Sequence, residues 1–534
     1  MGQASAHDGQ SQWQLIWREF RKRPLAVASA VVVFLLILAS VWAPFLANDR
    51  PLMYFGVNRA EYRESLRTCN GAIGRLIEGR QKEPDKPPLK TLVQALKLHV
   101  GLMAAAVSPD DSQRLNTWFG MLQAALADAD ATAGAQKLAE LKKTLSGDLS
   151  ERSVTFQAKT RWPVFASLNW LDVGFLVWSL TTVSAPAWRL LLRFVRVKSR
   201  RISAAWLVWL GVPLLAAGLW WWRVPAREDQ TQYKQGVLAE HAEQAIGRVP
   251  VVYEGVVWPP IPYGLAESVL EKKYLRPAWL EEKPSNGKTE EAAAPPSSAL
   301  RRTRTSWDRP HWLGTDSLGR DVLSRMIWGG RVSLSVGVVS VSIYVVLGVL
   351  IGAVAGFFRG FVDLIISRII EVVICFPTFF LILTIVALRG PNIMNIMVVI
   401  GLTGWTGVAR LVRAEFLRLV DQEFVLAGRA LGYTPVRLIF RHVLPNAMAP
   451  VLVAATFGIA GAILTESALS FLGLGITIPI PSWGGILLDG RRSEGAAPWL
   501  VFLPGLAIFV TITCYNLVGE ALRDASDPRL RGSR

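Results

Sequence analysis

Residues able to carry out chemistry are scarce in this chain. It contains no G-x-x-x-x-G-K-[ST] run, so the sequence predicts no Walker A loop for nucleotide binding. It contains neither H-E-x-x-H nor G-x-S-x-G, the signatures of common zinc proteases and serine hydrolases. The five histidines are scattered, and the three cysteines form no Cys-x-x-Cys pair. We therefore expect no catalytic residues, no metal site and no cofactor.

Acidic residues in long apolar runs are the remaining candidates for a functional site. Glu371 begins one such run, Glu466 follows the end of another, and Asp172 interrupts a third. An acid buried in a membrane span is costly and often marks a transport pathway, so Glu371 and Glu466 are candidate pathway residues. The simpler interpretation places both at membrane interfaces, and we favour it. We also place Asp172 at a span boundary, because a charge at the bilayer centre costs about 3 kcal/mol or more. It has no obvious partner for intramembrane proteolysis.

Long apolar runs dominate the chain and predict an all-α polytopic membrane protein. Hydrophobic residues make up 51% of the sequence and charged residues 19%, with a mean hydropathy of +0.32. A bilayer-spanning helix needs about 20 apolar residues. We expect eight such helices, at Leu25–Ala47, Pro163–Ala185, Ala204–Trp222, Leu334–Phe358, Val372–Leu388, Met394–Val412, Ala447–Leu464 and Leu500–Leu517.

The fourth of these spans contains several glycines and is preceded by polar residues. Its glycines are expected to allow close packing between helices, and they are Gly337, Gly348, Gly352 and Gly356. The polar residues just ahead of it are expected to cap the helix, and they are Asp316, Gly319, Arg320 and Asp321.

Basic residues predict the direction of the spans. Four of them precede the first span, and six lie between the second and third with no acid among them. Because cytoplasmic loops are enriched in Lys and Arg, both termini and the loop 413–446 should be cytoplasmic. The arginines within 301–309 would then lie outside, where the rule has little force in a long segment. The net charge of +17 fits such loops, so we expect contact with membrane lipids and not with nucleic acid.

The same patterns predict how the chain is divided. Residues 1–24 are a cytoplasmic N-terminus, 25–47 the first span, 48–162 an extracytoplasmic, largely helical insert, and 163–222 a transmembrane hairpin. Residues 223–330 are a second extracytoplasmic segment with a flexible linker at 282–305, and 331–534 are the membrane core. Leucines at helical spacing indicate the helices of the insert, and they are Leu92, Leu96, Leu102, Leu122, Leu126, Leu138 and Leu141.

A segment between the sixth and seventh spans has the most specific local pattern. Glu423–Leu431 places apolar residues on one helical face and is followed by Gly432, where a left-handed cap is expected. Thr434 and Pro435 then fit the N-cap and first position of a second helix. A rigid helix–turn–helix of this kind fits a groove on a partner protein. A helix lying on the bilayer surface fits the pattern at least as well.

This segment resembles the EAA motif of permease subunits in binding-protein-dependent ABC importers. The motif maps onto Leu426-Ala427-Gly428, then Gly432, His442 and Leu444-Pro445. Leu426 replaces the usual Glu, Gly428 the second Ala, and His442 the usual Ile. Three further segments resemble the C-type dipeptide and oligopeptide permeases, in family order: HWLGTDSLGRDVLSRMIWGGRVSL at 311–334, ALSFLGLGI with PSWG at 468–484, and APWLVFLPGLAIF with GEALRDASDPR at 497–529.

The resemblance implies transport without covalent chemistry in this chain. It implies a bacterial inner-membrane complex with a second homologous permease subunit, two ABC ATPase subunits and an extracytoplasmic solute-binding protein. It also implies that one set of residues couples ATP hydrolysis to transport, namely Glu423, Leu426, Ala427, Gly428, Gly432, His442, Leu444 and Pro445. The family core has six spans, so the hairpin and the insert resemble additions. The missing Glu puts the role of that carboxylate in doubt.

Two other functions stay open from the sequence. A polytopic membrane hydrolase would need a nucleophile and a base, and no such signature is present. An ion-driven secondary transporter would need paired halves with broken helices, and no paired halves are seen. The cargo also stays open among dipeptides, oligopeptides, peptide antibiotics and metal chelates.

Overall fold

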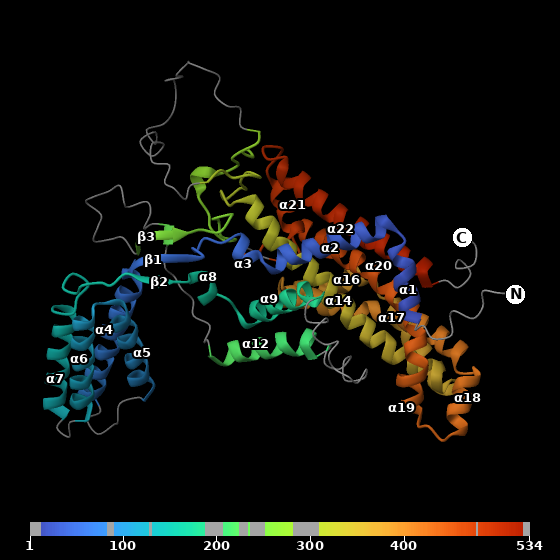
Figure 1. Cartoon of the computed structure of the whole chain (residues 1–534), viewed down its shortest axis with the longest axis horizontal. Helices are drawn as coiled ribbons and strands as arrows, with labels where there is room; N and C mark the ends of the chain where they lie inside the picture. The colour runs from blue at the N-terminus through green and yellow to red at the C-terminus, as the bar shows by residue number, and fades with distance from the viewer. Residues whose placement is uncertain are drawn as a thin grey trace, which may run out of the picture. The chain divides into compact units, whose positions relative to one another are not determined.

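The computed structural model describes residues 12–82, 90–127, 131–186, 205, 207–223, 233–234, 251–280, 309–476 and 479–526 (Figure 1). The chain forms two compact units. One comprises Met1–Ala43, Tyr263–Ser285 and Pro310–Arg534, and the other comprises Pro44–Pro262 and Asn286–Arg309. The predicted basic loop between the second and third spans and the predicted linker at 282–305 lie outside the described residues.

The first unit is a bundle of long apolar helices. Among the described residues, five helices are long and apolar enough to cross a membrane. They are α2 (Pro24–Val41), α14 (Val322–Phe358), α17 (Ile393–Leu419), α20 (Leu444–Phe471) and α22 (Trp499–Ser526). A sixth candidate is the pair α15 (Gly360–Ile374) and α16 (Thr378–Arg389), bent by 70° at the break between them. The chain is therefore a mostly helical, polytopic membrane protein.

Glycines let α14 pack directly on α17. A Cβ added at Gly348 would lie 2.6 Å from the Cβ of Val408, and one added at Gly352 would overlap the carbonyl oxygen of Ala409. Glycine permits this approach because it has no side chain, and small residues associate membrane helices in this way. The predicted close packing is confirmed for all four glycines: Gly337 against α20, and Gly348, Gly352 and Gly356 against α17.

Several helices begin or end away from the predicted span limits. α14 begins twelve residues before the predicted start, because Asp321 caps it by accepting a hydrogen bond from the backbone N–H of Ser324. The predicted span Val372–Leu388 is interrupted at Pro377, where α15 cannot continue, so two helices replace one. The first span helix ends at Val41, and the short α3 (Ala43–Leu46) follows it.

The second unit contains a small antiparallel sheet, so the all-α prediction is wrong. Its strands are β1 (Met53–Asn58), β2 (Lys159–Arg161) and β3 (Val251–Val257), in the order β2-β1-β3. The buried ring of Tyr54 in β1 packs against the rings of Tyr233 and Tyr253. Aromatic and β-branched residues favour strands, but these runs are too short to stand out beside the long apolar segments.

Four helices of the second unit form a bundle of their own: α4 (Arg59–Lys82), α5 (Lys90–Ala106), α6 (Pro109–Ala127) and α7 (Ala131–Ser146). Leucines predicted from helical spacing are buried in its core or pack against it, and they are Leu92, Leu96, Leu122, Leu126, Leu138 and Leu141. The Tyr62 hydroxyl donates to the carbonyl oxygen of Leu149 at 2.6 Å and connects the turn after α7 to α4. The predicted helices are confirmed, and α4 extends them ahead of the predicted region.

Two shorter apolar helices stand where the second and third spans are predicted. α9 (Trp170–Val183) follows the short α8 (Pro163–Ala166), and α12 (Val212–Arg223) continues the π-helical η1 (Leu207–Gly211). They pack at Gly174, where an added Cβ would lie 3.2 Å from the Cβ of Ala217. α9 has 14 residues, fewer than the roughly 20 that cross a bilayer. Asp172 lies in its first turn and accepts a bond from the backbone N–H of Asn169, so it stands at the boundary of this helix.

Candidate functional site

A helix–turn–helix between α17 and α20 projects from one end of the bundle (Figure 1). We call it the elbow. It consists of α18 (Glu423–Ala430), α19 (Pro435–Arg437) and the π-helical η6 (Leu438–Val443), which runs directly into α20. Gly432 lies in the turn with φ +74°, and the Thr434 side chain accepts a bond from the backbone N–H of Arg437. The predicted left-handed cap, N-cap and first-position Pro435 are all confirmed.

The elbow buries one set of residues and exposes another. The buried residues join its two arms to the bundle, and they are Val425, Gly428, Leu438, Ile439 and Val443. Gly428 allows this packing, because an added Cβ would lie 2.7 Å from Cδ2 of Leu438. Other large apolar residues of the elbow are 42–71% exposed, and they are Phe424, Leu426, Leu431, Val436 and Phe440. Several exposed apolar residues on one projecting segment are typical of a contact surface.

The remaining residues of the predicted coupling set lie in three places. Glu423 and Ala427 are exposed on α18, and the half-buried Leu444 and the exposed Pro445 begin α20. His442 lies inside the elbow, where its ring stacks on a tyrosine that the sequence analysis missed.

That tyrosine is Tyr433, directly after the turn glycine. Its ring centroid lies 5.6 Å from that of His442, and the guanidinium carbon of Arg437 lies 3.9 Å from it on the ring face. The Tyr433 backbone N–H donates to the carbonyl oxygen of Gly428. The stacked rings of His442 and Tyr433 therefore connect the two arms of the elbow. The sequence signal for Tyr433 was an aromatic residue directly after a glycine that ends a helix.

The first turn of α14 joins a buried network of two arginines and two aspartates. Asp316 accepts from Nε of Arg320 at 2.7 Å and also pairs with Arg325. Asp489, in α21 (Trp483–Arg492), accepts from Nη1 of Arg325 at 2.9 Å. All four are buried, and their opposite charges balance, as buried charges require. The prediction that the residues ahead of α14 cap the helix is confirmed for Asp321. Asp316 and Arg320 belong to the buried network instead.

Glu466 is wholly buried between α14 and α20. Ser333 of α14 donates to it at 3.0 Å and Ser470 of α20 at 2.7 Å. Ser333 also accepts from the backbone N–H of Trp483 at 3.3 Å, which connects the group to α21. A buried carboxyl group needs such donors, because its removal from water is costly. Glu466 is therefore enclosed by the bundle, whereas the Glu371 side chain is exposed. The favoured position of both acids at membrane interfaces stays a prediction.

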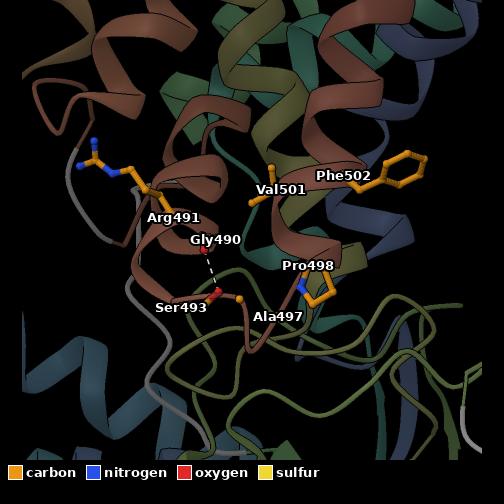
Figure 2. A pocket seen from close by; sticks show the side chains of 8 residues that line it. Gly490, Arg491, Ser493, Ala497, Pro498, Val501 and Phe502 are labelled. Carbon is orange, nitrogen blue, oxygen red and sulfur yellow. Dashed lines mark hydrogen bonds between the residues drawn. The ribbon is translucent and has the colours of Figure 1, made fainter.

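A shallow hollow lies where α21 meets α22 (Figure 2). Its volume is ≈ 470 Å³, and the lining residues are Gly490, Arg491, Ser493, Gly495, Ala497, Pro498, Val501 and Phe502. The Ser493 hydroxyl already donates to the carbonyl oxygen of Gly490 at 2.7 Å, and Arg491 extends away from the hollow (Figure 2). The hollow therefore offers few convergent polar groups. Within the described part of the chain, no group of three or more acidic, histidine or cysteine side chains is placed to hold a metal ion.

Two family profiles match separate parts of this chain. Residues 348–532 match the profile of the binding-protein-dependent transport system inner membrane component. Residues 11–59 match the N-terminal TM domain of oligopeptide transport permease C. The first match includes α15, the elbow, α20 and α22.

Characterised relatives agree with these matches. The dipeptide transport system permease protein DppC of Alkalihalophilus pseudofirmus is 41% identical over 221 residues, which are 41% of this chain and 73% of the relative. The oligopeptide transport system permease protein OppC of Haemophilus influenzae is 41% identical over 221 residues, which are 41% of this chain and 71% of the relative. This chain belongs to the family of binding-protein-dependent transport system inner membrane components.

Membership of this family confirms the resemblance found in the sequence. The chain is a permease subunit of an ABC import system, it crosses the inner membrane several times, and its role is transport and not catalysis. A permease subunit of such a system transports its cargo together with an ATPase and a binding protein. The functional question therefore moves from catalytic residues to the surfaces that meet those partners.

Proposed function

We propose that this permease subunit imports peptides and that the elbow receives mechanical work from the ATPase. The relatives named above are dipeptide and oligopeptide permeases, and 41% identity to them supports a peptide cargo. In this proposal the loop 413–446 docks in a groove of the ATPase. Closure of the ATP-bound ATPase pair then moves the elbow, and the bundle switches between outward-facing and inward-facing states.

The observation that carries this proposal is the exposed apolar surface of the elbow. Leu426, Leu431 and Val436 are held in place by a rigid, capped turn, so a partner can bind them without ordering the segment first. Each large apolar side chain that becomes fully buried stabilises a complex by about 1.5–3 kcal/mol.

The substitution of Leu426 for the usual Glu changes the expected chemistry of this contact. An apolar side chain at this position favours a hydrophobic contact over an ion pair. Glu423 lies one turn earlier, is exposed, and is the carboxylate of α18 that remains available to a basic partner group.

The assembly that we propose contains a second homologous permease subunit, two ATPase subunits and an extracytoplasmic solute-binding protein. The elbow and both termini of this chain would lie in the cytoplasm, since the ATPase needs ATP from there. The insert at 48–162 would lie on the opposite side, where the binding protein delivers its cargo.

We also propose that α9 and α12 complete an eight-span topology. Both helices are apolar and expose large side chains that fit a lipid environment, including Leu171, Phe175, Leu180, Leu214 and Leu215. Exposed tryptophans stand at the ends of the pair, as at membrane interfaces: Trp170, Trp221 and Trp222. Two added crossings keep the elbow on the same side of the membrane.

Glu371 and Glu466 are the two proposed pathway acids, and they differ in access. Glu371 is exposed on α15 in the present arrangement. Glu466 could meet a cargo only after its bonds to Ser333 and Ser470 separate, which requires a different arrangement of α14 and α20.

The test of the proposed function places a charge in the docking surface. Ala427→Asp puts a charge into an apolar contact, and Gly432→Pro is incompatible with the positive φ of the turn. We expect both variants to insert in the membrane but to import peptide at least about tenfold more slowly and to retain less ATPase on co-purification. Lys22→Asp, at an exposed position directly after α1 (Gln12–Arg21), is the matched control. Normal uptake by both elbow variants would contradict the proposal.

The cargo is tested separately. The solute-binding protein purified with this permease should carry a bound peptide that mass spectrometry can identify. A metal chelate without peptide in that position would contradict the proposed cargo and leave the coupling role untouched.

A further inference from the structure

Arg359 joins α14 to α15 at the end of the bundle that carries the elbow. Its backbone has φ 55° and ψ −165°, a conformation that glycine adopts readily and other residues adopt only under constraint. Gly360 follows with φ +54°. A single residue, Arg359, therefore lies between the end of α14 and the start of α15, and we call this junction the corner. The backbone strain of the corner is at Arg359.

The Arg359 side chain reaches from this corner to the end of α17. Its Nη2 donates to the carbonyl oxygen of Leu417 at 2.9 Å and to Oδ2 of Asp421 at 2.7 Å. Leu417 lies in the last turn of α17, where carbonyl groups lack helical partners and a cation is favourable. Asp421 lies in the short link between α17 and α18. One guanidinium group thus holds the corner, the end of α17 and the approach to the elbow together.

Neighbouring contacts join the same elements. Arg413 of α17 forms a two-bond ion pair with Asp363 of α15. The guanidinium carbon of Arg429 in α18 lies 5.5 Å from the ring centroid of Phe357, in the last turn of α14. Side chains at this corner therefore connect α18 to α14 and α17 to α15.

Charge keeps the bond between Arg359 and Asp421 in place at neutral pH. The hydrogen bond from Arg359 holds the pKa of Asp421 below its usual range. Both side chains are well exposed, at 40% and 64%, so the pair can separate without leaving a charge buried. A bond of this kind can break and re-form in each transport cycle.

We propose that Arg359 is a positioning residue that converts movement of the elbow into a change of the angle between α14 and α15. This inference rests on the proposed coupling function of the elbow. The two bonds of its side chain hold its backbone in the strained conformation. When the elbow moves away from the corner, the bond to Asp421 is lost and residue 359 relaxes. Because only residues 359 and 360 control the corner, this relaxation changes the angle between the two helices.

The test uses the complete complex, reconstituted in lipid vesicles with its ATPase and binding protein. Asp421→Asn removes the charge and keeps the shape, whereas Arg359→Gly removes both the side chain and the strain. We expect each variant to retain the ATPase on co-purification and to lower the amount of peptide imported per ATP by about fivefold or more. The double variant should be no worse than the more impaired of the two single variants, because both changes remove the bond between Arg359 and Asp421.

The matched control is Arg418→Gln, which removes an exposed ion pair with Glu415 contained within α17. It should leave the import-to-ATP ratio within about twofold of the parent, since such pairs contribute little. A ratio that stays within the same range in both Arg359→Gly and Asp421→Asn would overturn the proposal. Losses that multiply in the double variant would also overturn it, because the two residues would then act independently.

Ala427→Asp separates this inference from the proposed function. If Ala427→Asp leaves import normal, the elbow itself has no coupling role. If Ala427→Asp abolishes import while both corner variants keep the parent ratio, the coupling role stands and the role of Arg359 is refuted.

Discussion

The two ends of α14 are held by the same kinds of charged residue in opposite surroundings. In its first turn, Arg325 belongs to a network with Asp316 and Asp489 from which solvent is excluded. Beyond its last turn, Arg359 and Asp421 form a pair that stays open to solvent. The helix between them has 37 residues, which correspond to about 55 Å along its axis.

This difference indicates which end can change its contacts. Breaking a buried pair leaves an uncompensated charge and costs about 3–5 kcal/mol. An exposed pair contributes only about 0–1 kcal/mol. We therefore infer that the α21 end keeps its arrangement while the elbow end exchanges partners. Such a difference suits a permease that is moved at the elbow end. If the contacts at the α21 end broke as well, the movement of the elbow would not be transmitted along α14.

The largest effect is expected from breaking the buried network. Arg320→Ala leaves Arg325 alone with two aspartates, and it should lower the free energy of unfolding by about 3–5 kcal/mol. Thermal unfolding of the detergent-solubilised protein measures the loss. Arg368→Ala removes the exposed pair with Glu371 and should cost less than about 1 kcal/mol. Equal melting temperatures for the two variants would show that burial does not distinguish the stabilities of the two kinds of pair.

A smaller effect is expected in the middle of α14. Gly352→Ala places a methyl group against the carbonyl oxygen of Ala409, which no side-chain rotation can relieve, and should cost about 1–3 kcal/mol. Gly407→Ala on α17 is the control, because an added Cβ there has no neighbour within 4 Å. The same unfolding assay compares them. If Gly352→Ala is as stable as the control, the contact between α14 and α17 is not the rigid link between the two ends.

The smallest effect concerns a buried carboxylate of the second unit. The backbone N–H of Thr155 lowers the pKa of Asp111 most, and hydrogen bonds from Arg114 and Ser108 add to this effect. A folded-state pKa below the unfolded value near 3.9 gives stability that is complete above about pH 5 and is lost as the pH falls through the folded value. Asp111→Asn should therefore cost about 1 kcal/mol at pH 6 and progressively less toward pH 3, measured by thermal unfolding. A pH-independent cost would contradict this assignment.

The elbow shows how far a local sequence pattern can be trusted. Gly432, Thr434 and Pro435 predicted a cap, an N-cap and a helix start, and each depends only on neighbours within a few residues. The same sequence gave no sign of the buried network, because Arg325 and Asp489 are 164 residues apart. Local spacing cannot report a contact that only the packing of α21 creates.

The burial of Glu466 and the β-sheet were not predicted, for related reasons. An acid near the end of an apolar run is ordinarily interfacial, but here Ser333 from another helix supplies a donor that the run itself does not contain. The strands are three to seven residues long and pair across more than 100 residues of sequence. The predicted spans correspond to single helices where the apolar runs are long. The break at Pro377 was missed, because hydropathy does not report a change in the direction of a helix.

The most direct test of the account is a crosslink from the exposed face of the elbow. Leu426→Cys, in a chain whose exposed Cys375 is replaced by Ser, should crosslink to the ATPase subunit and should react with a thiol reagent only from the cytoplasmic side. The account predicts that the yield of the crosslink changes when ATP is bound. Labelling of Leu426→Cys from the extracytoplasmic side, or no crosslink to the ATPase in any nucleotide state, would contradict it.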